Sequence, residues 1–162
     1  MPSEDTAAAS SGGLPAKTPN RRRQNRIAAV QNLYGWDIVR PENLAEYMRQ
    51  FFTTQENRRD YYAFAEELVI GIVGNLEAVD EVIRAHVQNW AFNRIAKIDL
   101  AILRLATYEL LYRRDIPPVV TINEAIEISK LFSVAESKGF INGILDKIKE
   151  RLTRPFRESL QE

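Results

Sequence analysis

The chain of 162 residues has no cysteine and a single histidine, His86. Without cysteine it can form neither a disulfide nor a thiolate metal site, and this composition fits a reducing cytoplasm. No apolar run approaches the ~18 residues of a membrane-spanning helix. The first residues also lack the basic and then apolar pattern of a secretory signal. The sequence therefore favours a cytoplasmic protein without a metal or other cofactor.

Few of the remaining side chains are suited to catalysis. A lone histidine on a predicted helix is usually a surface or packing residue, which makes His86 a weak candidate for a general base. The sequence has no phosphate-binding glycine loop, no dinucleotide fingerprint and no pair of metal ligands at helical spacing. We therefore expect a binding protein and not an enzyme. Catalysis through His86 or a carboxylate pair would require a pocket with convergent acids.

The charges balance overall, with 22 basic and 22 acidic residues, but they are segregated along the chain. Residues 40–81 carry nine acids and four bases, a net charge of −5. Residues 21–26 include four arginines and no acid, and residues 138–157 have six bases against two acids. If the two basic segments meet in space, they form a binding site for a polyanion.

Composition and periodicity divide the chain into a tail, an all-α domain and a second tail. Residues 1–20 have almost no large apolar side chains and are predicted to be disordered. Residues 21–152 repeat apolar positions at helical spacing and show no period-two strand pattern, which predicts a single helical domain. Residues 153–162 form the C-terminal tail.

The expected helices follow from this spacing and from residues that start or stop a helix. The first runs from an N-cap at Asn20 to about residue 38, and Pro41 is placed to open the second. A third is expected over residues 60–87, with a bend or break near Gly74. Residues 99–112 are apolar on almost all sides, which is typical of a central, covered helix.

Two further helix starts are predicted from capping boxes. Thr121 and Glu124 have the spacing at which each side chain caps the other residue's N–H group, so the next helix should begin at Thr121. Ser133 and Glu136 have the same spacing before the last helix.

Arg21, Arg22, Arg23 and Arg26 are the strongest charge feature. The positive end of a helix dipole repels arginines in the first turns. Each such arginine destabilises the helix by about 0.3–1 kcal/mol at low salt. Because no acid lies nearby in the sequence, an external polyanion would relieve this cost. The four residues are predicted to bind phosphate groups, and a solvated helix start is the alternative.

The start of the last predicted helix also suits RNA. Lys138, Phe140 and Asn142 combine a cation, an aromatic ring and an amide, and unpaired bases stack on such rings. The alternative places Phe140 in the core. Gly139 and Gly143 lie on one helix face, where we expect a neighbouring helix to pack closely.

The first helix has more apolar residues than its own core face requires. Tyr34, Trp36 and Ile38 follow the arginines, and the default expectation is that they belong to the core. Exposure of Trp36 or Ile38 would instead mark a surface for a protein partner.

Four motifs occur in a fixed order along the chain. They are Arg21-Arg22-Arg23 followed by residues 29–36, residues 98–110, Asp115-Ile116-Pro117 with residues 122–127, and residues 137–146. Together they resemble the family of the transcription antitermination factor NusB, over roughly residues 21 to 148. The likeness is weak between residues 39 and 87.

The resemblance implies an all-α fold of about seven helices in two packed halves. It implies a non-enzymatic adaptor that binds the boxA element of nascent RNA, mostly ribosomal RNA leaders. The adaptor binds together with a small-subunit ribosomal protein, NusE, and the pair joins an antitermination complex on RNA polymerase.

The resemblance also assigns roles to single residues. Those matched to RNA contacts are Arg21, Arg22, Arg23, Arg26, Ser137, Lys138 and Phe140. Those matched to the side that faces the ribosomal protein are Tyr34, Ile38 and Asp99, and the helix pattern adds Trp36. Asp99 is expected at the exposed start of the central helix.

Two departures and one alternative accompany the resemblance. Ser133 stands where the family often has glycine, and Glu136 where aspartate is common, so the RNA contacts of that loop stay open. The alternative is a purely protein-binding helical module, such as a homodimer that uses Tyr34 and Trp36. It predicts no affinity for RNA beyond that for any polyanion.

Overall fold

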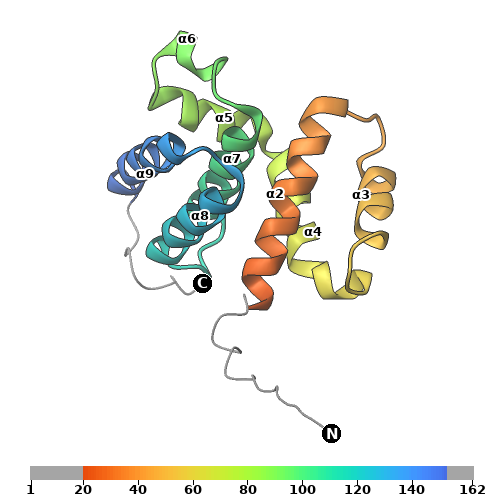
Figure 1. Ribbon diagram of the computed structural model, residues 1–162. Helices are drawn as coiled ribbons and strands as arrows, with labels where there is room; N and C mark the ends of the chain where they lie inside the picture. The colour runs from red at the N-terminus through yellow and green to blue at the C-terminus, as the bar shows by residue number, and fades with distance from the viewer. Residues whose placement is uncertain (1–19, 153–162) are drawn as a thin grey trace, which may run out of the picture.

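Eight α-helices and one short 3₁₀ helix make up residues 20–152, which are the residues that the computed structural model describes (Figure 1). In chain order they are α2 (Arg21–Val39), α3 (Leu44–Thr53), η2 (Arg59–Tyr62), α4 (Ala63–Gly74), α5 (Leu76–Ala85), α6 (Asn89–Phe92), α7 (Lys97–Tyr112), α8 (Pro118–Phe132) and α9 (Ala135–Glu150). This part of the chain contains no strand, so the all-α prediction is confirmed. Apart from Asn20, both predicted tails lie outside the described residues. Within residues 20–152 no helix is long and apolar enough to cross a membrane.

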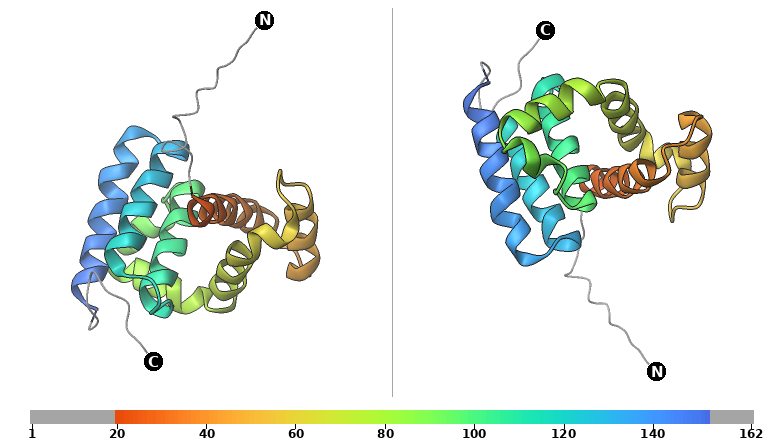
Figure 2. Two further views of the ribbon diagram at one scale, coloured as in Figure 1. Left: turned by 90° about the horizontal axis from the view of Figure 1, so that it is seen from below. Right: turned by 90° about the horizontal axis from the view of Figure 1, so that it is seen from above.

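The helices form two groups that share one core. α2, α3 and α4 lie on one side and α5 to α9 on the other, and α2 is seen end-on between α3 and α7 in Figure 2. α7 contacts α2, α4, α5, α8 and α9, and 11 of its 16 residues are buried. The apolar core runs without a break from α2 to α9. The prediction of a central, covered helix is therefore confirmed.

α2 begins where the sequence predicts, whereas α3 does not. The Asn20 side chain accepts a hydrogen bond of 2.7 Å from the Arg23 N–H group, as an N-cap should. Arg40 then takes a left-handed conformation, with φ 48°, which ends the helix. Pro41 does not open α3, because Asn43 caps that helix by accepting from the Glu46 N–H group.

The long helix expected over residues 60–87 is broken as predicted. α4 ends at Gly74, and the Asn75 N–H group closes its last turn onto Gly71 and Ile72. Gly71 has a second role, because a Cβ atom there would lie 2.0 Å from the Tyr108 hydroxyl of α7. This glycine therefore lets α4 approach α7 closely.

Both predicted capping boxes are wrong. α8 begins three residues early, at Pro118, because proline suits the first position of a helix. Thr121 thus lies inside α8, and its hydroxyl donates to Glu109. α9 begins at Ala135 with Val134 as its N-cap residue, and Ser133 makes a different contact.

The close packing expected at the two glycines of α9 is also wrong. A Cβ atom at Gly139 or Gly143 would meet no atom within 4 Å. The buried face of α9 instead carries Ile141, Ile144 and Ile148.

Candidate nucleic-acid and partner interface

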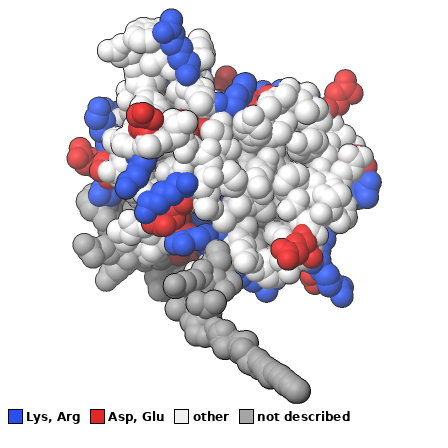
Figure 3. All heavy atoms as spheres, viewed as in Figure 1, with Lys and Arg blue, Asp and Glu red and all other residues white. Residues whose placement is uncertain are grey.

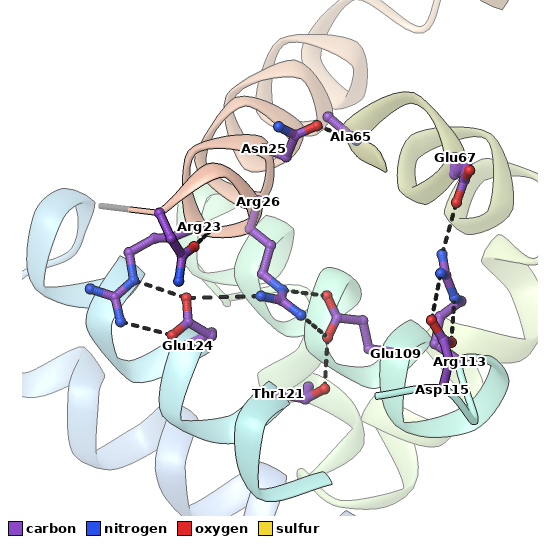
Figure 4. Close-up of polar contacts among 11 residues, drawn as sticks. Arg23, Asn25, Arg26, Ala65, Glu67, Glu109, Arg113, Asp115, Thr121 and Glu124 are labelled. Atoms are coloured by element: carbon purple, nitrogen blue, oxygen red, sulfur yellow. Dashed lines mark hydrogen bonds and ion pairs between the residues drawn. The ribbon is translucent and has the colours of Figure 1, made fainter. Parts of the chain in front are cut away.

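The four arginines of α2 divide into two pairs that face different neighbours. Arg23 and Arg26 point toward α7 and α8 (Figure 4). Arg23 donates two hydrogen bonds to Glu124 of α8, at 2.9 and 2.7 Å. The side chain of Arg23 keeps 32% of its surface exposed, so part of it remains accessible to a ligand.

Arg26 lies beneath Arg23 and is only 3% exposed. It donates to Glu109 at 2.7 and 3.2 Å and lies 3.9 Å from Glu124 (Figure 4). Glu109 is fully buried and also accepts a 2.6 Å hydrogen bond from Thr121. Arg26 therefore has no surface to offer RNA.

Arg21 and Arg22 lie on the other side of α2, against η2 and α4. Arg21 donates to the backbone oxygens of Tyr61 and Asp60, and its guanidinium lies 4.5 Å from the Tyr61 ring centroid. Arg22 lies 4.0 Å from the Phe64 ring centroid. Both arginines are exposed and border a groove of about 380 Å³.

One cation from each basic segment of the sequence acts on Glu127 of α8. The Lys130 ammonium donates to Glu127 at 3.0 Å, and this contact and the charges of Arg23 and Lys138 hold the pKa of Glu127 below its usual range. Cations from α2, α8 and α9 therefore act on one carboxylate. Figure 3 shows basic and acidic side chains gathered on this part of the molecule, whereas the surface over α2 and α3 is largely uncharged.

The first turn of α9 is tied to the start of α7 through Asp99. Asp99 accepts hydrogen bonds from Ser133 at 2.5 Å and from Ser137 at 2.6 Å. Asp99 is 6% and Ser137 7% exposed, so the expectation of an exposed Asp99 is wrong. The serine at position 133 thus gives the α8–α9 loop a contact that a glycine could not make. Ser137 acts here by holding this loop in place.

The residues next to Ser137 do reach the surface. Lys138 is exposed, and Phe140 is 40% exposed, so the alternative that places Phe140 in the core is wrong. Phe140 borders a groove of about 380 Å³ that α9 forms with the segment between α6 and α7. Lys138 and Phe140 therefore offer a cation and a ring to a ligand.

The residues predicted to face a protein partner separate into exposed and buried ones. Tyr34 is 40% and Ile38 57% exposed, whereas Trp36 is 6% exposed and belongs to the core. Tyr34 borders an apolar groove of about 530 Å³ between α2, the start of α7 and the end of α8. Exposed apolar side chains beside a groove are typical of a partner surface.

His86 fits the packing role expected of it. Its Nδ1 atom lies 2.8 Å from the Val82 backbone oxygen, one turn earlier in α5. Among residues 20–152, no cluster of histidine, aspartate or glutamate side chains could hold a metal ion.

The comparison with known proteins identifies the family. Residues 23–150 match the model of the NusB family. The chain belongs to the NusB family. It is 45% identical to the transcription antitermination protein NusB of Citrifermentans bemidjiense over 139 residues, which cover 82% of this chain and 96% of that protein. It is 44% identical to the protein of the same name from Bacillus cereus over 135 residues, 82% of this chain and 99% of the relative.

Solved NusB structures have the same fold. A NusB structure from T. maritima superposes with a TM-score of 0.74 at 37% identity, over 85% of this chain and 94% of that one. A structure of the antitermination factors NusB and NusE in complex with double-stranded RNA gives a TM-score of 0.71 at 25% identity, over 82% and 98%. The expected all-α NusB-like fold is thus confirmed.

The sequence analysis did not predict that Glu124 and Glu127 pair with cations on the surface over α8. Glu124 was assigned to a helix cap, although it pairs with an arginine 101 residues earlier. The one local signal is the spacing of Glu127 and Lys130, which is that of an ion pair within one helix.

Proposed function

We propose that this protein is a non-enzymatic transcription antitermination factor that binds boxA-type RNA of nascent ribosomal transcripts together with NusE. The pair would act in a complex on RNA polymerase, in the cytoplasm. The relatives named above are antitermination proteins, and one related structure contains NusB, NusE and RNA. The observation that carries the proposal is the surface over α8, where Lys130 pairs with Glu127 and the charges of Arg23 and Lys138 act on the same carboxylate.

This surface has the two components that single-stranded RNA requires. Arg23, Lys130 and Lys138 supply positive charge for phosphates, and Phe140 supplies a ring for stacking. Phosphate contacts release counterions and so depend on salt, whereas stacking depends on salt much less. Neither component reads a base sequence in detail, which is a reason for a second protein to take part in recognition.

The groove beside Tyr34 is the surface that we assign to NusE. Tyr34 borders this groove, and Ile38, one turn further along α2, is also exposed, whereas Asp99 and Trp36 are buried. Ala96 borders both this groove and the groove beside Phe140. RNA and NusE would therefore lie next to each other, so that each protein adds contacts to the same RNA.

The test measures binding of boxA-type and scrambled RNA by variants of Lys138 and Arg23. Lys138→Ala and Arg23→Ala, alone and together, are titrated at several salt concentrations with and without NusE. Each lost phosphate contact should lower the slope of log K against log salt by about 0.7, the value for single strands. The double variant should thus lose about 1.4 from the slope, as well as affinity.

The control pair is Arg49→Ala with Lys147→Ala, which removes the same charge from exposed positions on α3 and the far part of α9. This pair should bind RNA with nearly the wild-type slope. Equal slopes for the two double variants would contradict the proposal. Stable dimers that bind boxA-type and scrambled RNA equally, with or without NusE, would favour the purely protein-binding module.

A further inference from the structure

Trp90 is a large aromatic side chain that the core does not use. It belongs to α6, the single turn at the edge of the molecule in Figure 1, and 61% of its surface is exposed. The Arg94 guanidinium lies over its ring, 5.0 Å from the centroid. No acid among residues 20–152 forms an ion pair with Arg94, so the positive charge of Arg94 is available to a ligand.

Arg94 of this pair borders the groove beside Phe140. Arg94 and Ile95 border it on one side, and Ser137 and Phe140 of α9 border it on the other. Phe140 also follows Lys138, whose charge acts on Glu127. An extended ligand that passes Lys138 and Phe140 therefore comes next to Arg94 and Trp90.

We propose that Trp90 and Arg94 form a second stacking position for the bound RNA, across the groove from Phe140. This inference rests on the proposed function, because it extends the same RNA site. Exposed rings combined with cations are the usual means by which proteins hold unpaired bases, since every base has a face that can stack. Arg94 stiffens the Trp90 ring and contributes a cation for the neighbouring phosphate.

The acids of the groove determine which part of the RNA enters it. Glu136 is exposed at its edge, and Asp99 lies at its floor, where both carboxylate oxygens accept from serines. A phosphate on the floor would be repelled by these charges, whereas a neutral base would not. A base should therefore occupy the groove, with the sugar–phosphate backbone outside it near Lys138 and Arg94.

The experiment uses Trp90 itself as the probe. The chain has two tryptophans, and Trp36 is buried, so Trp36→Phe leaves the exposed Trp90 as the single tryptophan, whose emission is excited selectively at wavelengths that tyrosine does not absorb. This variant is titrated with a short boxA-type RNA and with versions extended by several nucleotides at either end. An extended RNA should quench the emission of Trp90 and protect it from acrylamide, and the short RNA should do so less.

Binding affinity gives the second readout. Trp90→Ala in the otherwise natural chain should weaken binding of an extended RNA by a factor of about 5 to 150, the usual range for one stacked base. The short RNA should be affected little. The control is Ile70→Ala, which trims an apolar residue of similar exposure on α4 and should change neither affinity.

Three other results would contradict the inference, and each has a different meaning. If Trp90→Ala and Ile70→Ala bind the extended RNAs equally and Trp90 emission does not change, the second position does not exist, although RNA binding at Lys138 stands. If NusE without RNA changes the emission of Trp90 and RNA does not, Trp90 and Arg94 contact the protein partner and not RNA. If the natural chain binds no boxA-type RNA even with NusE, the proposed function fails as well.

Discussion

The buried pair of Arg26 and Glu109 distinguishes a structural arginine from one that contacts RNA. Arg26→Ala would remove two hydrogen bonds, of 2.7 and 3.2 Å, from a carboxylate that has no exposed surface. Removing one member of a buried ion pair costs about 3–5 kcal/mol, because the other charge stays buried. Since a domain of this size is stable by only about 5–15 kcal/mol, we expect the variant to lose about a fifth of its stability or more.

Urea unfolding followed by circular dichroism measures this loss. With a urea dependence of about 1–3 kcal/mol per molar, the midpoint should fall by about 1 M or more. The double variant Arg26→Met, Glu109→Leu removes both charges and keeps most of the volume, so it should recover most of the stability. Its RNA affinity and salt slope should stay close to those of the natural chain, because neither residue reaches the surface.

Two results would refute this reasoning. If the double variant is as stable as the natural chain but loses RNA affinity and salt slope as Lys138→Ala does, Arg26 contacts RNA directly. A stable Arg26→Ala protein would likewise show that the Glu109 carboxylate does not depend on this arginine.

Two more predictions follow from single positions. Glu127→Gln removes the carboxylate among the cations over α8, so RNA affinity should rise and its salt dependence should steepen in filter-binding assays; unchanged affinity would show that RNA does not approach this acid. Gly71→Ala places a Cβ atom 2.0 Å from the Tyr108 hydroxyl and should cost about 1–3 kcal/mol in urea unfolding. Gly74→Ala, which has open space around it, is the control, and equal stability of the two variants would argue against the close approach of α4 and α7.

Local rules of the sequence predicted most helices and some of their ends. The Asn20 cap and the break at Gly74 depend on neighbours within a few residues, and both are present in the structure. The capping box at Thr121 failed for a similar local reason, because Pro118 starts the helix earlier. Because Thr121 lies inside α8, its hydroxyl donates a hydrogen bond to the buried Glu109 carboxylate and does not cap the helix backbone.

The candidate site was predictable in composition but not in geometry. The sequence places four arginines at the start of one helix, yet a helix turns by about 100° per residue and aims them in different directions. Which arginine is buried depends on the acids of α7 and α8, far away in the chain. Arg23 and Arg26 meet such acids, whereas Arg21 and Arg22 meet the rings of Tyr61 and Phe64.

The sequence by itself determined the fold class, the central apolar helix and the family, because periodicity and long ordered motifs are properties of the chain. Only the tertiary structure decided which of the charged and aromatic residues face solvent. Packing of α7 against α2 buries Arg26 beside Glu109, and Ser133 and Ser137 cover Asp99. Trp36 is buried as well, whereas Lys138 and Phe140 stay exposed. Burial depends on contacts between distant segments, and a buried charge is stable only where such a contact supplies its partner.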